Sequence, residues 1–417
     1  MIQRTNYINI INHWWERNDN TALFVLGPVE VGKTTLIMNW ASNKDVSYRF
    51  FDEKEYELIK DVFLEAKERN FDVSLAIVNK LFMGKPLEEL LIFDGVMPGD
   101  EIIVQLKNLC ANSRHRFILI SDYGEYVFEK IRFIPVGSIS KLVVKPLSFK
   151  EYCLLKTNRY SIDSVQLYLD KEDKTVLPFS RLFESFWEEY SNYGGFPSVV
   201  EKVMSEGNIS AEIELLRIKK RIISFVEQNI PFSSGPAAIL NKFNNGRSTS
   251  YRRFIFSSVS ENGTLQRYKR SINILERMGI ISVFPFVGDK LVFEYCDLYL
   301  CDPGLERIWG EDAERKHIVE SIVFNYGVRK GCKPYRFVLA DRRIIDIAWD
   351  YKIPTIIEIK LKNTNSLSSA VDKLNYYRNH NAETTYKPVV LVDKGIDYVN
   401  TVSYARIFPI WAFLLGE

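Results

Sequence analysis

Eight consecutive residues, Gly27 to Thr34, have the types and spacing of a phosphate-binding loop. They match the pattern G-x-x-x-x-G-K-[ST] at every position. Gly27 and Gly32 allow the backbone to turn tightly so that successive N–H groups face a phosphate, while Lys33 can reach the β- and γ-phosphates. The hydroxyl of Thr34 is a ligand for Mg²⁺, so we expect ATP and Mg²⁺ as the cofactors of this loop, with Thr35 also among the cofactor-binding residues.

An acidic residue further along the chain completes the expected nucleotide site. Asp94 ends the apolar run Leu90 to Phe93, and an aspartate at the end of a buried strand serves the metal in P-loop proteins. Hydrolytic enzymes of this class commonly place a glutamate next, but the next residue here is Gly95. Glycine cannot orient water, so we expect slow hydrolysis or another carboxylate in that role, such as Asp122. If the glycine limits turnover, Gly95→Glu is expected to raise phosphate release.

A third set of charged residues lies near the C-terminus. Asp346 lies within the apolar run Ile344 to Trp349, and Glu358 and Lys360 follow in the next apolar run. Because residues two apart in a strand share a face, Glu358 and Lys360 project together. A carboxylate buried between isoleucines needs a partner, and a divalent metal is a suitable one. The alternative is a hairpin in which Glu358 and Lys360 form a surface salt bridge.

The elements that must position these residues are those of an α/β protein. The run Ala22 to Leu26 predicts a strand before the phosphate-binding loop, and the apolar spacing from Lys33 onward predicts a helix after it. The runs Leu90 to Phe93 and Phe117 to Ile120 are typical of strands buried on both faces of a parallel sheet. We therefore predict an α/β P-loop domain over residues 1–150.

Three further regions are predicted after it. Residues 151–232 have a helical pattern. Residues 233–305 contain a capped helix from Thr264 followed by a hairpin, which is the order of a winged helix. Residues 306–417 again alternate between helices and strands. The predicted fold class is therefore α/β and multidomain, with a P-loop NTPase parallel sheet, a helical and winged-helix middle region and a C-terminal α/β domain.

The predicted helix after Thr264 has one apolar face and one basic face. The basic face carries Arg267, Lys269, Arg270 and Arg277, a composition that suits contacts with DNA phosphates and base edges. A basic face that meets only solvent is common, and winged helices also bind proteins. DNA and a protein partner therefore stay open as alternatives.

The chain as a whole resembles a family of prokaryotic AAA-type ATPases that join a P-loop domain to a helical and winged-helix part and a nuclease-like C-terminal domain. The resemblance rests on the phosphate-binding loop through Thr35, on the strand ending at Asp94, and on Lys145–Tyr152, Tyr193–Pro197 and Asp302–Gly304. The family usually has a glutamate in place of Gly95 and an arginine in place of Ser138. Both differences favour a nucleotide switch over an enzyme that hydrolyses ATP rapidly.

The C-terminal charged residues look like the D…ExK site of restriction-endonuclease-like folds. The resemblance implies that Asp346 and Glu358 hold Mg²⁺, that Lys360 positions or activates the attacking water, and that Glu320 completes the metal site. We therefore predict an ATPase or nucleotide switch that controls a Mg²⁺-dependent DNA nuclease. The alternative is a non-catalytic ATP-dependent switch that docks on DNA or on a protein partner, with an inactive nuclease fold.

The composition narrows the class of protein. The 417 residues carry a formal net charge of +2, so any DNA binding must come from local basic patches. The sequence has no apolar run long enough for a membrane helix and no signal-peptide pattern, which predicts a cytoplasmic protein without a membrane partner. Five cysteines without C-x-x-C spacing predict thiols rather than disulfides or a zinc site. Because many P-loop proteins form rings, a homo-oligomer is among the expected assemblies.

Overall fold

The chain forms two compact units in the computed structural model. The first comprises residues 1–145 with 277–280, and the second comprises residues 146–276 with 281–417. The first unit thus ends at residue 145 where the sequence predicted a boundary at 150, and the three regions predicted after it lie in the second unit except for residues 277–280. The structure describes residues 4–17, 21–65, 89–112, 115–131, 137, 139–171, 174–230, 235–243, 247–248, 253–288, 292–309, 314–350, 352–362, 366–380, 386–402 and 404–416. Ser138 lies outside these ranges.

The first unit is built on a parallel sheet, as predicted, and this sheet has five strands. Its strands in chain order are β1 (Ala22–Leu26), β2 (Tyr48–Phe51), β3 (Leu90–Phe93), β4 (Arg116–Ser121) and β5 (Ile139–Val143). The spatial order is β2-β3-β4-β1-β5, and every neighbouring pair is parallel. All residues of β1 and β3 are buried, which explains their uninterrupted apolar sequence. The carboxyl ends of these strands therefore meet at one edge of the sheet.

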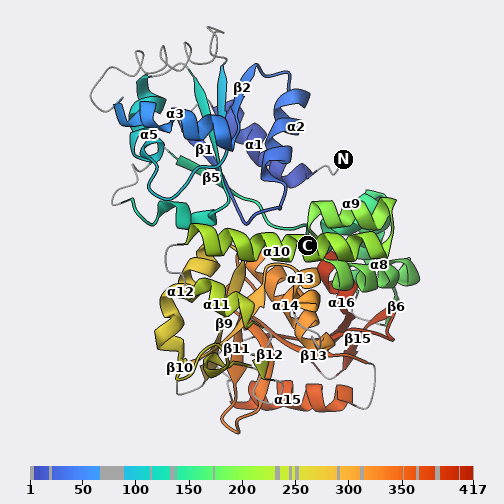
Figure 1. The fold of residues 1–417 in the computed structure, drawn as a ribbon. Coiled ribbons are helices and arrows are strands. Elements are labelled where there is room, and N and C mark those ends of the chain that lie inside the picture. Colours follow the sequence, from blue (N-terminus) through green and yellow to red (C-terminus); the bar gives the residue numbers. More distant parts are fainter. Residues whose placement is uncertain are drawn as a thin grey trace. The chain divides into compact units, whose positions relative to one another are not determined.

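Helices flank this sheet on both sides (Figure 1). They are α1 (Thr5–Arg17), α2 (Lys33–Asn43), α3 (Glu53–Glu65) and α5 (Glu101–Asn112), with the short 3-10 helix η1 (Gly124–Phe128) after β4. Trp40 of α2 donates a hydrogen bond from Nε1 to Oδ1 of Asn12 on α1, at 2.9 Å, and its ring lies edge-on to Trp15. These contacts hold α2, and with it the end of the phosphate-binding loop, against α1.

The second unit contains a nine-stranded mixed sheet. Its strands are β6 (Thr175–Val176), β9 (Ile281–Gly288), β10 (Val292–Leu300), β11 (Tyr335–Val338), β12 (Ile344–Trp349), β13 (Thr355–Lys360), β14 (Lys387–Val392), β15 (Tyr398–Val402) and β16 (Ala405–Pro409). They lie in the order β10-β9-β11-β12-β13-β14-β16-β15-β6, and β7 (Arg247–Ser248) pairs with β8 (Arg253–Phe254) apart from them. The predicted hairpin is formed by β9 and β10, but β9 also pairs in parallel with β11. The hairpin is thus part of the C-terminal sheet, and the winged-helix assignment stays a prediction.

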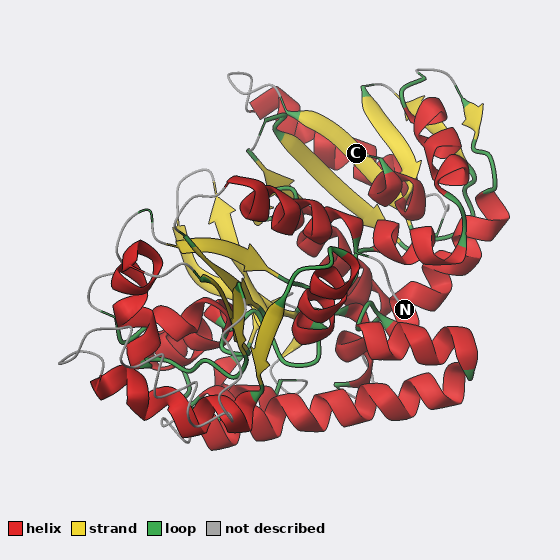
Figure 2. Cartoon of the chain, turned by 90° about the horizontal axis from the view of Figure 1, so that it is seen from above, coloured by secondary structure: helices red, strands yellow, loops and turns green. Residues whose placement is uncertain are grey.

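Helices line the second sheet on both faces (Figures 1 and 2). Leu374 of α15 packs with Ile356 and Val390 on one face, while α14 contacts β12 and β13 and α16 contacts β14 and β16 on the other. The helices of this unit are α6 (Phe149–Lys156), α7 (Arg159–Leu169), α8 (Ser180–Tyr193), α9 (Pro197–Ser205), α10 (Asn208–Asn229), α11 (Pro236–Asn241), η2 (Phe256–Ser258), α12 (Leu265–Arg277), α13 (Pro303–Ile308), α14 (Arg315–Arg329), α15 (Ser366–His380) and α16 (Ile410–Leu415). No helix within the described ranges is long and apolar enough to cross a membrane.

Candidate functional site

The predicted phosphate-binding loop lies at the carboxyl end of β1, between this buried strand and the first turn of α2. Gly27 has a φ of +150°, and a Cβ atom added there would lie 2.2 Å from the carbonyl oxygen of Val144. Gly32 has a φ of 80° and begins α2 in the left-handed conformation. Both conformations favour glycine. The two glycines of the motif therefore serve the backbone geometry for which the sequence predicted them.

Lys33 lies inside the loop rather than on its surface. Its side chain is 4% exposed, and its ammonium group donates hydrogen bonds to the carbonyl oxygens of Gly27 at 3.0 Å and Pro28 at 2.7 Å. The same ammonium group lies 2.5 Å from Oδ1 of Asp122, which follows β4. The structure thus places Asp122, the alternative carboxylate of the sequence analysis, beside the loop.

Thr34 and Asp94, which the sequence analysis assigned to the metal, lie in contact. The hydroxyl of Thr34 donates a hydrogen bond to Oδ2 of Asp94, at 2.6 Å. Burial raises the pKa of Asp94, the bond from Thr34 opposes that shift, and the negative charge of Asp122 adds to it. A hydroxyl oxygen and a carboxylate oxygen this close are the kind of donors that Mg²⁺ takes when phosphates and water supply the rest. Thr35, by contrast, is exposed on α2.

Residues 19–153 match the model of a family described as an AAA domain. This part of the chain is an AAA-type P-loop domain. The matched segment begins just before β1 and ends within α6, so it includes every strand of the first sheet. It covers less than half of the chain, and the second unit is outside it except for its first residues.

The chain is also similar, at low sequence identity, to three other proteins. An uncharacterized protein of Haemophilus influenzae is 22% identical over 361 residues, which cover 79% of this chain and 80% of that protein. A replication initiator DnaA solved with AMPPCP and single-stranded DNA has 14% identity and a TM-score of 0.31, covering 64% of this chain and 86% of its own. A signal transduction ATPase with a tetratricopeptide repeat sensor, from Pyrococcus horikoshii, has 12% identity and a TM-score of 0.30, covering 79% and 46%. Such low TM-scores carry no argument about this protein.

The C-terminal carboxylates Asp346 and Glu358 lie side by side on neighbouring strands. The antiparallel register pairs Ile347 of β12 with Ile357 of β13, so residues 346 and 358 are the next pair along. The N–H of Asp346 donates to Oε1 of Glu358 at 3.2 Å, and the N–H of Ile359 donates to Oδ2 of Asp346 at 2.7 Å. Both carboxylates are 0% exposed. The two strands therefore hold the D…ExK acids together in the interior.

Lysine side chains, which the sequence analysis did not include, neutralise these two acids. Lys373 of α15 donates to both carboxylate oxygens of Glu358, at 2.8 and 2.7 Å, whereas Lys360 lies 3.9 Å from that carboxylate. Lys316 of α14 lies 3.4 Å from Asp346. Burial and the charge of Asp346 raise the pKa of Glu358 to about 7, while burial lowers the pKa of Lys360. The surface salt bridge offered as the alternative is not what forms, because Glu358 is buried.

Glu320 shares Lys316 with Asp346 but is held mainly by other partners. Its Oε2 atom accepts hydrogen bonds from Arg336 at 2.7 Å and from the hydroxyl of Tyr299 at 3.1 Å. Lys316 lies 3.8 Å from its other oxygen. In the part of the chain that is described, no group of three or more His, Cys, Asp or Glu residues is arranged to hold a metal ion. Glu320 would have to leave Arg336 to join Asp346 and Glu358 around a metal.

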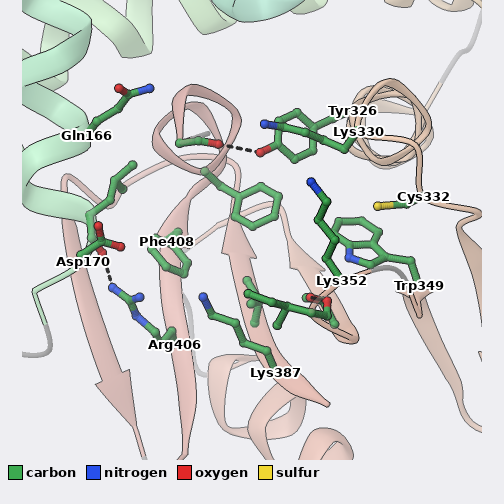
Figure 3. Close-up of a pocket in the computed structure, with 16 residues that line it drawn as sticks. Gln166, Asp170, Tyr326, Lys330, Cys332, Trp349, Lys352, Lys387, Arg406 and Phe408 are labelled. Carbon is green, nitrogen blue, oxygen red and sulfur yellow. Dashed lines mark hydrogen bonds between the residues drawn. The ribbon is translucent and has the colours of Figure 1, made fainter. Parts of the chain in front are cut away.

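A cavity of about 440 Å³ lies where β12 ends and β13 begins (Figure 3). Cationic side chains from distant parts of the sequence line it, namely Lys330, Lys352, Lys387 and Arg406. Burial and the charge of Arg406 lower the pKa of Lys387. Arg406 donates to the carbonyl oxygen of Lys171 at 3.3 Å, and Lys330 and Lys352 also have partners. The first residues of β13 and β14 line this cavity, so it is separate from the carboxylate pair.

Proposed function

We propose that the AAA-type domain binds MgATP, hydrolyses it slowly, and through its nucleotide state controls a Mg²⁺-dependent DNA nuclease in the second unit. Nucleotide binding is supported by the hydrogen bond of 2.6 Å between Thr34 and Asp94. This bond lies next to the loop that encloses the ammonium group of Lys33. These groups come from β1, α2 and β3, and a chance glycine turn would not gather them.

Each residue of the site has a defined task in this proposal. The backbone N–H groups between Gly27 and Gly32 and the first turn of α2 attract the phosphates, and Lys33 exchanges its bonds to loop carbonyls for bonds to phosphate oxygens. Thr34 and Asp94 would hold Mg²⁺, with Asp94 acting directly or through a water molecule. When bound, the ion neutralises charge on the β- and γ-phosphates.

The nuclease part of the proposal rests on Asp346, Glu358 and Lys360. Two buried carboxylates at paired positions, with an amine on the same face of β13, are the groups that a metal-dependent phosphodiesterase uses. Asp346 and Glu358 would hold Mg²⁺, and Lys360 would position the attacking water. Lys373 and Lys316 would have to withdraw when the metal enters, since they now neutralise the same oxygens.

That neutralisation favours a second candidate function. With both oxygens of Glu358 bonded to Lys373, the carboxylate pair is already satisfied without a metal. The second unit would then be a non-catalytic partner of the AAA-type domain, and ATP would govern its docking on DNA or on a protein. Arg267, Lys269 and Arg270 of α12 are exposed, and their positive charge suits contact with DNA or with a protein in this function.

Calorimetry with MgATP tests nucleotide binding. Wild-type protein should bind, and Lys33→Ala should lose binding because the loop then lacks its cation. Lys44→Ala is the matched control: this lysine follows the same helix, is exposed, and pairs with Glu16 at 3.6 Å. The proposal fails if wild-type protein shows no MgATP binding. Light scattering with and without nucleotide would show whether binding assembles a homo-oligomer.

Nicking of supercoiled plasmid DNA in the presence of Mg²⁺ and ATP tests the nuclease. Asp346→Asn and Lys360→Ala should abolish nicking, while Lys362→Ala, an exposed lysine two residues further on, should not change it. Equal background nicking in wild-type protein and all variants would reject the nuclease. Retention of DNA that depends on ATP, without nicking, would support the docking function instead.

A further inference from the structure

The space next to Asp94 is filled by a side chain from the start of helix α3. Gly95 has a φ of +83°, and a Cβ atom added there would lie 2.8 Å from Cγ and 3.1 Å from Cβ of Glu53. Such distances are far below van der Waals contact. The side chain of Glu53 therefore occupies the space into which a side chain at position 95 would project.

The sheet register explains why these two residues meet. β2 and β3 are parallel neighbours, and Phe51 pairs with Phe93 at their carboxyl ends. The N–H of Asp94 donates to the carbonyl oxygen of Phe51 at 3.0 Å, which extends the ladder by one step. Glu53 and Gly95 each follow this last pair by two residues. They are thus level with each other at the edge of the sheet where the phosphate-binding loop lies.

We propose that Glu53 is the catalytic carboxylate of the AAA-type domain, in the role that a glutamate at position 95 has in related hydrolytic P-loop enzymes. This inference rests on the proposed binding and hydrolysis of MgATP. Glu53 accepts a hydrogen bond from the attacking water, whose oxygen forms a bond to the γ-phosphorus. The bond from that phosphorus to the β,γ-bridging oxygen breaks, and its electron pair stays with ADP. The water proton passes to Glu53 and from there to solvent.

Other carboxylates at this edge are already committed. Asp122 lies 2.5 Å from Lys33, and Asp100 accepts a hydrogen bond from the hydroxyl of Tyr56 at 2.9 Å. Asp52 accepts bonds from the first N–H groups of α3, at 3.0 and 2.8 Å. Glu53 itself is exposed, and among the described residues it makes no hydrogen bond or ion pair. An exposed carboxylate without a structural task is able to bind water.

The negative charge of Glu53 also acts on a tyrosine at this edge of the sheet. Burial, together with the negative charges of Asp100, Asp122 and Glu53, raises the pKa of Tyr123 to about 12. Tyr123 follows β4 directly after Asp122. Glu53 therefore lies close enough to influence the carboxyl end of β4 as well as that of β3. These are the strand ends that Asp122 and Asp94 follow.

The test compares ATP binding with phosphate release in Glu53→Gln. Glutamine keeps the size of the side chain but cannot accept the proton, so MgATP affinity should stay within about twofold while turnover falls roughly 100-fold or more. Glu57→Gln is the matched control, because Glu57 lies on the same helix and pairs with Lys60 at 2.5 Å; it should keep wild-type turnover. Glu53→Ala provides a second variant with the same expected result.

The possible outcomes separate this inference from the proposed function. Wild-type protein that fails to bind MgATP rejects the proposed function. Wild-type protein that binds MgATP without releasing phosphate overturns the catalytic role of Glu53 but leaves binding intact. Full turnover in Glu53→Gln overturns the role too, and would assign it to another carboxylate, with Asp122 tested next by Asp122→Asn. Loss of turnover with retained binding in both Glu53 variants supports the inference.

Discussion

The backbone N–H of Gly195 donates a hydrogen bond to Oδ2 of Asp302 across 2.6 Å in the buried interior of the second unit. The carbonyl oxygen of Gly195 accepts a bond from the N–H of Leu147, also at 2.6 Å. A Cβ atom at Gly195 would lie 2.1 Å from the oxygen of Leu147, and one at Gly194 would lie 1.9 Å from Oδ1 of Asp302. Three segments that carried the family resemblance thus meet at one point, where they hold α6, α8 and α13 together.

Replacement of Asp302 by asparagine is expected to destabilise the second unit. Oδ1 of Asp302 also accepts hydrogen bonds from the N–H groups of Gly304 at 2.9 Å and Leu305 at 3.3 Å. In the asparagine variant, a side-chain NH₂ in place of Oδ2 would face the N–H of Gly195, so that two donors would meet. We expect the free energy of unfolding to fall by about 2–3 kcal/mol. Urea titration measures this, with the exposed Asp163→Asn as control. Equal stability of the two variants would contradict the structural role.

The stabilising effect of Asp302 should also depend on pH. Burial raises the pKa of Asp302 to about 6, although three backbone N–H groups oppose the shift. In the unfolded chain the pKa of an aspartate is near ~3.9, so the folded protein binds the proton more tightly. The resulting contribution to stability is full below about pH 4 and is lost as the pH rises through about 6. The gap in unfolding free energy between wild-type protein and Asp302→Asn should therefore shrink between pH 4 and pH 6; parallel profiles would exclude this.

Substitution of Gly95 should impair the AAA-type domain, contrary to the gain that the sequence alone led us to expect for Gly95→Glu. The φ of +83° and the contact with Glu53 leave no room for a side chain. Gly95→Ala should lower stability by about 1–3 kcal/mol, and Gly95→Glu should lower phosphate release. Gly137→Ala is the matched control, since Gly137 has a φ of +84° and open space beside it. Faster turnover in Gly95→Glu would show that Glu53 moves aside.

Removal of the buried Arg336 should be among the most destabilising single changes in the second unit. This side chain is 1% exposed and contacts Glu320 at 2.7 Å and Asp297 at 3.1 Å. Arg336→Met removes the closest cation from two buried carboxylates and should cost about 3–5 kcal/mol, as measured by denaturant titration. The exposed Arg343→Met should cost less than about 1 kcal/mol.

A rescue experiment separates charge from packing at Arg336. If uncompensated carboxylates cause the loss, adding Glu320→Gln and Asp297→Asn to Arg336→Met should restore most of the stability. A triple variant as unstable as Arg336→Met would instead assign the loss to the packing of the arginine against Phe284, whose ring centre lies 4.7 Å from the guanidinium carbon.

The sequence by itself determined those features that depend on contiguous residues or on strand periodicity. The phosphate-binding loop is one segment of eight residues flanked by a strand and a helix, so its glycines, Lys33 and Thr34 were all predictable. Asp94 was found from its place at the end of an apolar run. The pairing of Asp346 with Glu358 followed from two adjacent strands, because a hairpin brings such residues together whatever surrounds it.

Only the tertiary structure decided which groups from distant segments meet. β2 was not predicted, so nothing in the sequence placed Glu53 beside Gly95. Lys373 of α15 pairs with Glu358, and Arg336 of β11 pairs with Glu320. The sequence predicted that these two acids bind a metal, but in the fold their charges are neutralised by these cations. The reason is physical: a buried charge is stabilised by whichever opposite charge the fold brings near it, and that choice depends on packing rather than on spacing along the chain.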